Sequence, residues 1–293
     1  MAKHSLRSYI LVIYIMFLGH QIEGGEPWFV QALQAKGGGV TKSYKKYFAR
    51  HDTHVGSYFG LVATMEAYGF ELGYGQITST MIWVDNSLDD VQETNAIWVG
   101  WQVNPGMYGD SRTHFFTHWT RDGYRKTGCF NMNCTGFILT DGSQIAPGGI
   151  INPVSDVDGA RQKITLKVFR ESSIGDWWIH YGFNSAPKAV GYYPANLFTE
   201  LSKGATRIAF GSNSVAMNGY SAPPMGSGLL PSILSDKSAS IEEISFVDKD
   251  GKIRPFNVDT IKTETMSSCY VMTPLFGERG TRCLYGGPGN CVL

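Results

Sequence analysis

The sequence contains few charged residues and no excess of either sign. Only 17% of its 293 residues are charged, and 25 basic side chains balance 25 acidic ones. Nucleic-acid recognition needs clustered positive charge, so we expect no nucleic-acid partner. The chain also lacks a triplet glycine period, a heptad run and a second long apolar segment, which excludes collagen, coiled coils and multi-span membrane proteins. What it has instead is 35 glycines and many aromatic residues, a composition typical of an antiparallel β domain.

The one long apolar run lies at the amino terminus. Two basic residues precede an apolar stretch from Tyr9 to Leu18, and small residues follow. This order predicts a secretory signal peptide over residues 1–24, because a membrane-spanning helix needs about 20 apolar residues. An uncleaved signal anchor is the alternative. We expect residues 25–39 to form a short leader and residues 40–293 to form one domain. We also expect this domain to be a monomer that has no membrane partner once the signal is removed.

Secretion favours disulfides over metal binding as the role of the five cysteines. Cys129 and Cys134 enclose only four residues, so a bond between them would close a tight loop. The other three, Cys269, Cys283 and Cys291, can make one bridge and leave one thiol. No His or Cys pair has the spacing of a zinc site, and we expect no metal. Asn133 starts a formal glycosylation sequon whose middle residue is Cys134.

Short apolar or alternating runs, separated by Gly, Asn, Asp and Pro, predict strands along the whole domain. In Gln162–Phe169 the alternation is clean, and Ile164, Leu166 and Val168 should share a buried face. The single weak helical pattern is at Pro194–Leu201. The expected strands are Ile77–Val84, Ala96–Val103, Thr113–Thr120, Gln162–Phe169, Asp176–Tyr181, Thr206–Phe210 and Ser240–Val247.

The alternation also predicts which side chains share a face. In Ala96–Val103 the odd-numbered residues are all apolar, so we expect them in the core and the even-numbered ones on an open face or cleft wall. In Arg207–Gly211 the even-numbered residues should point inward by the same logic. The residues expected on open faces are Trp98, Gly100, Gln102, Arg207 and Ala209.

A series of short motifs runs in a fixed order through residues 40–292. It comprises Val99-Gly100-Trp101-Gln102-Val103-Asn104-Pro105, Tyr108-Gly109-Asp110, Phe116-Thr117-His118-Trp119-Thr120, Gly128-Cys129-Phe130-Asn131, Cys134-Thr135-Gly136-Phe137, Trp177-Trp178, Gly191-Tyr192-Tyr193-Pro194, Met225-Gly226-Ser227-Gly228, Cys269-Tyr270 and Tyr285-Gly286-Gly287-Pro288-Gly289. Each motif is weak alone, but the ordered set resembles the neprosin domain family of secreted plant proteins.

The resemblance implies an all-β fold, an antiparallel β-sandwich of two large curved sheets with an open cleft. It implies the disulfides Cys129–Cys134 and Cys269–Cys291, with Cys283 left as the odd thiol. It also implies a location outside the cell or in the cell wall. The family is similar to the glutamic peptidases. The resemblance therefore implies a secreted endopeptidase that cuts at proline and is active in acid. Glutamic peptidases use a pair of carboxylic acids and neither a metal nor an organic cofactor.

The sequence departs from that pattern at the two positions that matter for catalysis. The resemblance places the two catalytic glutamates of the family at Trp98 and Ala209, and neither side chain can accept a proton. We therefore expect a catalytically inactive binding domain. The alternative is an active, acid-pH glutamic peptidase that cleaves at proline with other acids, for which the candidates are Glu93, Asp110 and Asp176.

An inactive domain could still bind Pro-rich peptides or cell-wall glycoproteins and glycans. Trp98 would offer a flat surface to a proline ring or a sugar face, or it would simply fill the cleft. Gln102 would orient a water or a peptide carbonyl, or else bond to a neighbouring strand. We expect the Trp177-Trp178 and Tyr192-Tyr193 pairs to serve core and cleft-wall packing rather than ligand contacts.

Overall fold

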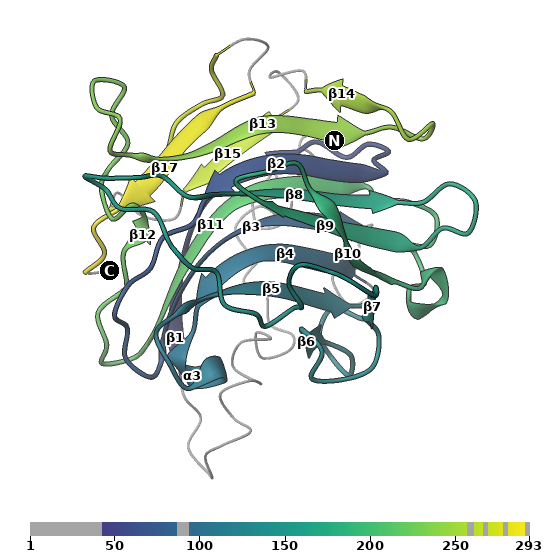
Figure 1. Ribbon diagram of the computed structural model, residues 1–293, viewed down its shortest axis with the longest axis horizontal. Coiled ribbons are helices and arrows are strands. Elements are labelled where there is room, and N and C mark those ends of the chain that lie inside the picture. The colour runs from purple at the N-terminus through teal and green to yellow at the C-terminus, as the bar shows by residue number, and fades with distance from the viewer. Residues whose placement is uncertain (1–42, 87–93, 257–260, 266–268, 278–280, 291–293) are drawn as a thin grey trace, which may run out of the picture.

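The computed structural model describes residues 43–86, 94–256, 261–265, 269–277 and 281–290, and every structural statement below concerns these residues. They form two antiparallel sheets that pack face to face (Figure 1). The predicted all-β fold is confirmed. The expected signal peptide and leader lie outside the described residues. Within them, no helix is long and apolar enough to cross a membrane.

The first sheet has seven strands in the order β15-β1-β11-β3-β4-β5-β6. Their bounds, in that order, are Ile261–Thr265, Tyr44–Thr53, Arg207–Met217, Gln76–Asn86, Asn95–Val103, Thr113–Thr120 and Cys129–Phe130.

The second sheet has ten strands, eight of them in the order β12-β17-β13-β2-β8-β9-β10-β7, with β14 paired to β13 and β16 to β17. The bounds of the eight, in that order, are Met225–Gly226, Cys283–Gly287, Ala239–Val247, Gly60–Glu66, Lys163–Arg170, Trp177–Phe183, Lys188–Tyr193 and Ile138–Leu139. Strands β14 and β16 span Ile253–Pro255 and Val271–Met272.

All seven strands expected from the sequence are present, as β3, β4, β5, β8, β9, β11 and β13. The weak helical pattern corresponds to a single 3-10 turn, η2, at Ala195–Leu197. One short helix was not predicted, α3 at Pro105–Tyr108. It is too short to show a helical period, but the side chain of Asn104 caps its first turn and Gly109 ends it at φ 81°.

The core lies between the two sheets. The odd-numbered residues of β4 belong to it, and so do Ile208 and Phe210 of β11, which confirms the predicted inward faces. The largest buried rings satisfy their polar atoms there, since the indole N–H groups of Trp101 and Trp177 each donate to a backbone carbonyl at 2.9 Å. Local alternation was therefore enough to find the core.

A second, smaller apolar cluster covers the opposite face of the seven-stranded sheet. Trp98 packs against it, and Ala209 belongs to it. Alternation predicted that this face is open to solvent. It is closed instead, because Gln102 and Ala209 are only 0% and 2% exposed. The buried members of this outer-face cluster are Ile77, Met81, Trp83, Phe116, Phe130, Ala209 and Val215.

The cysteines agree with the expected pattern as far as they are described. Cys129 and Cys134 form a disulfide, and Cys283 is a buried free thiol. Cys269 is disulfide-bonded. Cys291, its expected partner, lies outside the described residues.

Candidate functional site

The two positions at which the resemblance places catalytic acids lie in one cross-strand row. Strand β3 runs between β11 and β4, and its Trp83 is paired with Ala209 on one side and with Trp98 on the other. Ala209 and Trp98 are therefore two strands apart on the same face, which corresponds to about 10 Å between their Cα atoms. These two residues are far apart in the sequence, so the strand order alone brings them together.

Trp98 is part of a packed group of aromatic rings. Its ring centre lies 6.1 Å from that of Trp83, 5.5 Å from that of His118 and 5.6 Å from that of Tyr124. His118 in turn contacts the ring of Phe130 at 4.3 Å. Burial lowers the pKa of His118 to about 3, so this imidazole is neutral at ordinary pH. Trp98 thus lies in a cluster of aromatic rings, none of which carries a carboxylate.

Gln102 lies at the end of the same face and is held by its neighbours. Its Nε2 donates to the hydroxyl of Tyr108 at 2.8 Å, and Asn131 donates to that hydroxyl at 3.1 Å. Burial raises the pKa of Tyr108 to about 12, which keeps it a neutral phenol. Three motifs used for the resemblance therefore meet here. This environment supports a structural role for Gln102.

Two carboxylates on this face were missed by the sequence analysis. Asp52 of β1 is paired with Ala209, and its Oδ2 lies 2.7 Å from Nε of Arg50. Asp85 of β3 is paired with Arg207 and forms an ion pair with it at 3.3 Å. No local pattern marks them, because only the pairing of β1 and β3 with β11 brings them beside Ala209.

The acids considered from the sequence lie elsewhere. Asp110 follows α3 and accepts hydrogen bonds from Arg112 at 2.6 Å and His114 at 3.0 Å. The bond from Arg112 is the main reason that the pKa of Asp110 is well below its usual range. Asp176 accepts from the backbone of Ala195 at the start of η2. Neither belongs to the row of Ala209, Trp83 and Trp98, and Glu93 lies outside the described residues.

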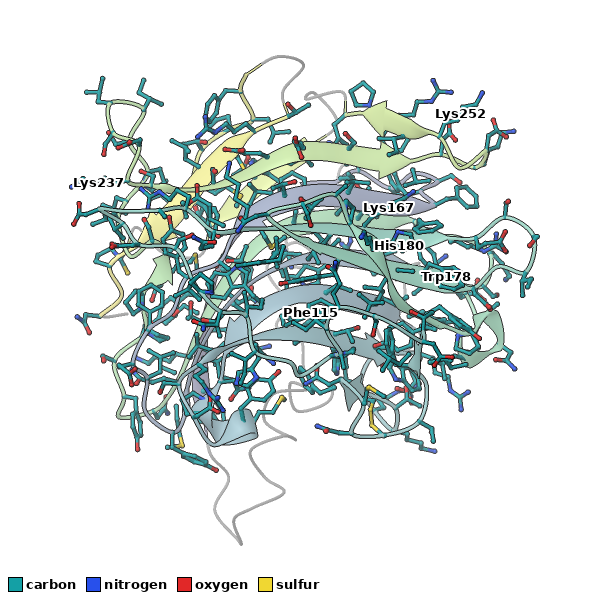
Figure 2. The ribbon with its side chains drawn as sticks, viewed as in Figure 1. Phe115, Lys167, Trp178, His180, Lys237 and Lys252 are labelled. Atoms are coloured by element: carbon teal, nitrogen blue, oxygen red, sulfur yellow. A yellow bond between two sulfur atoms is a disulfide. The ribbon has the colours of Figure 1, made fainter. Side chains whose placement is uncertain are left out.

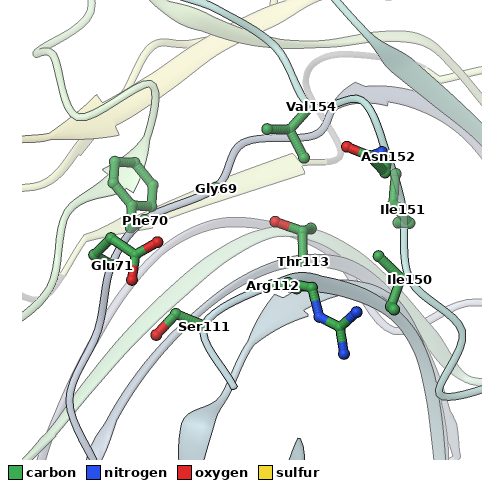
Figure 3. Close-up of a pocket in the computed structure, with 10 residues that line it drawn as sticks. All are labelled: Gly69, Phe70, Glu71, Ser111, Arg112, Thr113, Ile150, Ile151, Asn152 and Val154. Atoms are coloured by element: carbon green, nitrogen blue, oxygen red, sulfur yellow. The ribbon is translucent and has the colours of Figure 1, made fainter.

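A cavity of about 560 Å³ opens away from this row, between the segments 69–71, 111–113 and 150–154 (Figure 3). Its wall is mainly apolar, with Glu71 and Arg112 as the charged groups. The guanidinium of Arg112 is already engaged by Asp110. Among the residues that the structure describes, no three His, Cys, Asp or Glu side chains gather in a metal-binding group.

The sequence matches the family described as Neprosin over residues 74–288. The chain therefore belongs to the Neprosin family.

Solved structures with a similar arrangement include scytalido-glutamic peptidase with a transition state analog inhibitor. It is 11% identical, has a TM-score of 0.46 and covers 83% of this chain and 98% of its own. A second structure of that peptidase, with a peptide-based analog, is 14% identical, with a TM-score of 0.43 and coverage of 84% and 99%. SCP-B, a member of the Eqolisin family of peptidases in complex with the tripeptide Ala-Ile-His, is 12% identical, with a TM-score of 0.41 and coverage of 84% and 98%.

Proposed function

We propose that this protein is a secreted, catalytically inactive member of the Neprosin family. The observation that carries the proposal is the row Ala209–Trp83–Trp98, in which a methyl group and an indole occupy the two expected acid positions. Acid-pair hydrolysis needs one carboxylate to take a proton from water and a second group to stabilise the developing charge. A row of one methyl and two indoles supplies neither.

The packing of the row supports the same conclusion. Ala209 is buried, and Trp98 lies among Trp83, His118 and Tyr124, so the outer-face cluster fills the space that a peptide and an attacking water would need. The core between the sheets is a group of residues separate from this cluster. The disulfide Cys129–Cys134 is in keeping with secretion through the expected signal at residues 1–24.

The test is a cleavage assay of the purified full chain with a proline-containing peptide, at acid and at neutral pH. We expect no cleavage at either pH. Two variants, Asp52→Asn and Asp85→Asn, are assayed in parallel, because these acids share the face with Ala209. Asp141→Asn is the matched control, since that carboxylate is exposed and was not among the candidate acids.

One specific observation favours the alternative, an active acid peptidase that uses other acids. Asp52 is paired with Ala209, and Asp85 is paired with Arg207, two residues away on the same face. Each is held by an arginine, and such a pair leaves the carboxylate engaged rather than available to a water. Any cleavage by the unmodified chain would contradict the proposal, and cleavage that is lost in Asp52→Asn or Asp85→Asn but kept in Asp141→Asn would establish this alternative.

A further inference from the structure

A second aromatic surface lies on the outer face of the ten-stranded sheet. The register pairs Phe169 of β8 with Trp178 of β9, Trp178 with Tyr192 of β10, and Tyr192 with Ile138 of β7. These four residues, here called the outer aromatic row, cross four adjacent strands. At the usual strand spacing the row is about 14 Å long.

The Trp-Trp and Tyr-Tyr pairs form this row because strand side chains alternate between faces. Trp177 and Tyr193 are fully buried in the core, whereas Trp178 and Tyr192 are half-exposed. The inner ring of each pair lies in the core, as expected, and the outer ring lies half-exposed on the outer face of the ten-stranded sheet. The outer rings lie on a sheet different from the one that carries Ala209 and Trp98.

Two rings of the row adjoin each other. Trp178 and Tyr192 have ring centres 4.8 Å apart and planes inclined by 30°. The cavity between the segments 69–71, 111–113 and 150–154 and a second one along residues 232–238 are lined by none of the row residues. A ligand that inserts a side chain needs a recess, whereas a ligand with flat apolar faces needs a surface such as this one.

Polar groups at the edge of the row are free to bind a ligand. Within the described part of the chain, the indole N–H of Trp178, the hydroxyl of Tyr192 and the ammonium of Lys167 have no hydrogen-bonding partner. The Lys167 Nζ lies 4.2 Å from the ring centre of Phe169, and His180 lies against both Phe169 and Trp178. Figure 2 shows Lys167, His180 and Trp178 together over β8 and β9.

The charge of this surface is positive. No carboxylate of the described residues forms an ion pair with Lys167 or His180. Burial and the neighbouring Lys167 lower the pKa of His180, and burial also lowers the pKa of Lys167 from its usual value. Since the whole chain has no net charge, attraction of an anion to this point is a local property rather than a general one.

We propose that the outer aromatic row, with Lys167 beside it, binds a polysaccharide chain of carboxylate-bearing sugars. The apolar face of each sugar ring stacks on Trp178 and Tyr192, the indole N–H and the hydroxyl donate to sugar oxygens, and Lys167 pairs with a carboxylate. Exposed apolar patches with polar rims mark interaction sites, and this one combines adjoining rings, hydrogen-bond donors and a basic side chain. The inference is independent of whether the other face hydrolyses peptides.

The test is a titration of the purified full chain with polygalacturonate. The matched polymer is fully methyl-esterified, so that it has the same sugars without the charge, and a proline-rich peptide forms a third arm. We expect saturable binding of polygalacturonate that weakens about tenfold in Trp178→Ala and in Tyr192→Ala, and about fivefold in Lys167→Gln and for the esterified polymer. Tyr220→Ala and Lys252→Gln are the controls, because both residues are exposed and outside the row.

Thermal unfolding of each variant separates loss of binding from loss of fold, and half-exposed positions should tolerate the changes. The assignment is overturned if polygalacturonate does not bind, if both polymers bind equally, or if binding survives Trp178→Ala and Tyr192→Ala in folded protein. Proline-rich peptide binding that depends on Trp178 would likewise overturn it, and would make this face a peptide site.

Discussion

The side chains of Ala209 and Trp98 lie on one face of the seven-stranded sheet, separated only by Trp83. In the Neprosin family these two positions are where the resemblance places the acid pair. Their position in one row is the geometry from which we propose an inactive protein. Four predictions follow from the packing around them and elsewhere in the fold.

Returning a carboxylate to position 209 should destabilise the protein. The side chain is 2% exposed and lies between Asp52 and Trp83, so a new carboxylate would be desolvated beside another acid. We expect Ala209→Glu to lower the free energy of unfolding by about 3 kcal/mol, measured by urea denaturation. Ala160→Glu, at an exposed position, is the control and should be near neutral. Equal effects of the two changes would show that this face is not closed.

His118 should make the protein sensitive to acid. In the unfolded chain it takes up a proton below about pH 6.5, but burial lowers its folded pKa to about 3. Because the unfolded state then binds more protons, stability falls as the pH drops below 6.5, by roughly 2 kcal/mol over two units. Replacing His118 by Phe should remove this part of the acid loss in denaturation series at several pH values. The same series on His54→Phe, an exposed histidine, should match the unmodified chain.

Gly100, in the Val99–Pro105 motif, should not tolerate a side chain. A methyl group there would overlap with the backbone carbonyl of Thr80 on the adjacent strand β3. We expect Gly100→Ala to cost more than about 3 kcal/mol of stability or to prevent folding, as judged by expression and circular dichroism. Gly73→Ala serves as the comparison, since its new methyl group would meet only side-chain atoms of Gln76 and Tyr220, at ordinary contact distances. A stable Gly100→Ala protein would show that β3 and β4 can separate here.

The disulfide between Cys129 and Cys134 should contribute modestly to stability. The two residues are only five positions apart, so the bond restricts a short loop in the unfolded chain. The double change Cys129→Ala and Cys134→Ala should lower the free energy of unfolding by about 2 kcal/mol in the chain-entropy model. Guanidinium denaturation of both proteins measures the difference, and an unchanged midpoint would contradict it.

Much of the fold follows from the sequence itself. Period-two alternation is a local property. It therefore identified β3, β4, β5, β8, β9, β11 and β13, and it placed Ile97, Val99 and Ile208 in the core. The order of the motifs indicated the family before any geometry was known. The cysteine spacing left several pairings open, and the resemblance was needed to choose between them.

The tertiary structure decided what lies beside what. Asp52 is adjacent to Ala209, and Trp178 to Tyr192, only because strands distant in the sequence are paired in a particular order and register. Alternation assigns a residue to one of the two faces of a sheet. It does not tell whether other side chains cover that face, as at Trp98, or leave it exposed, as at Trp178. Those outcomes depend on side chains contributed by other strands, and the sequence read along one strand contains no information on its neighbours.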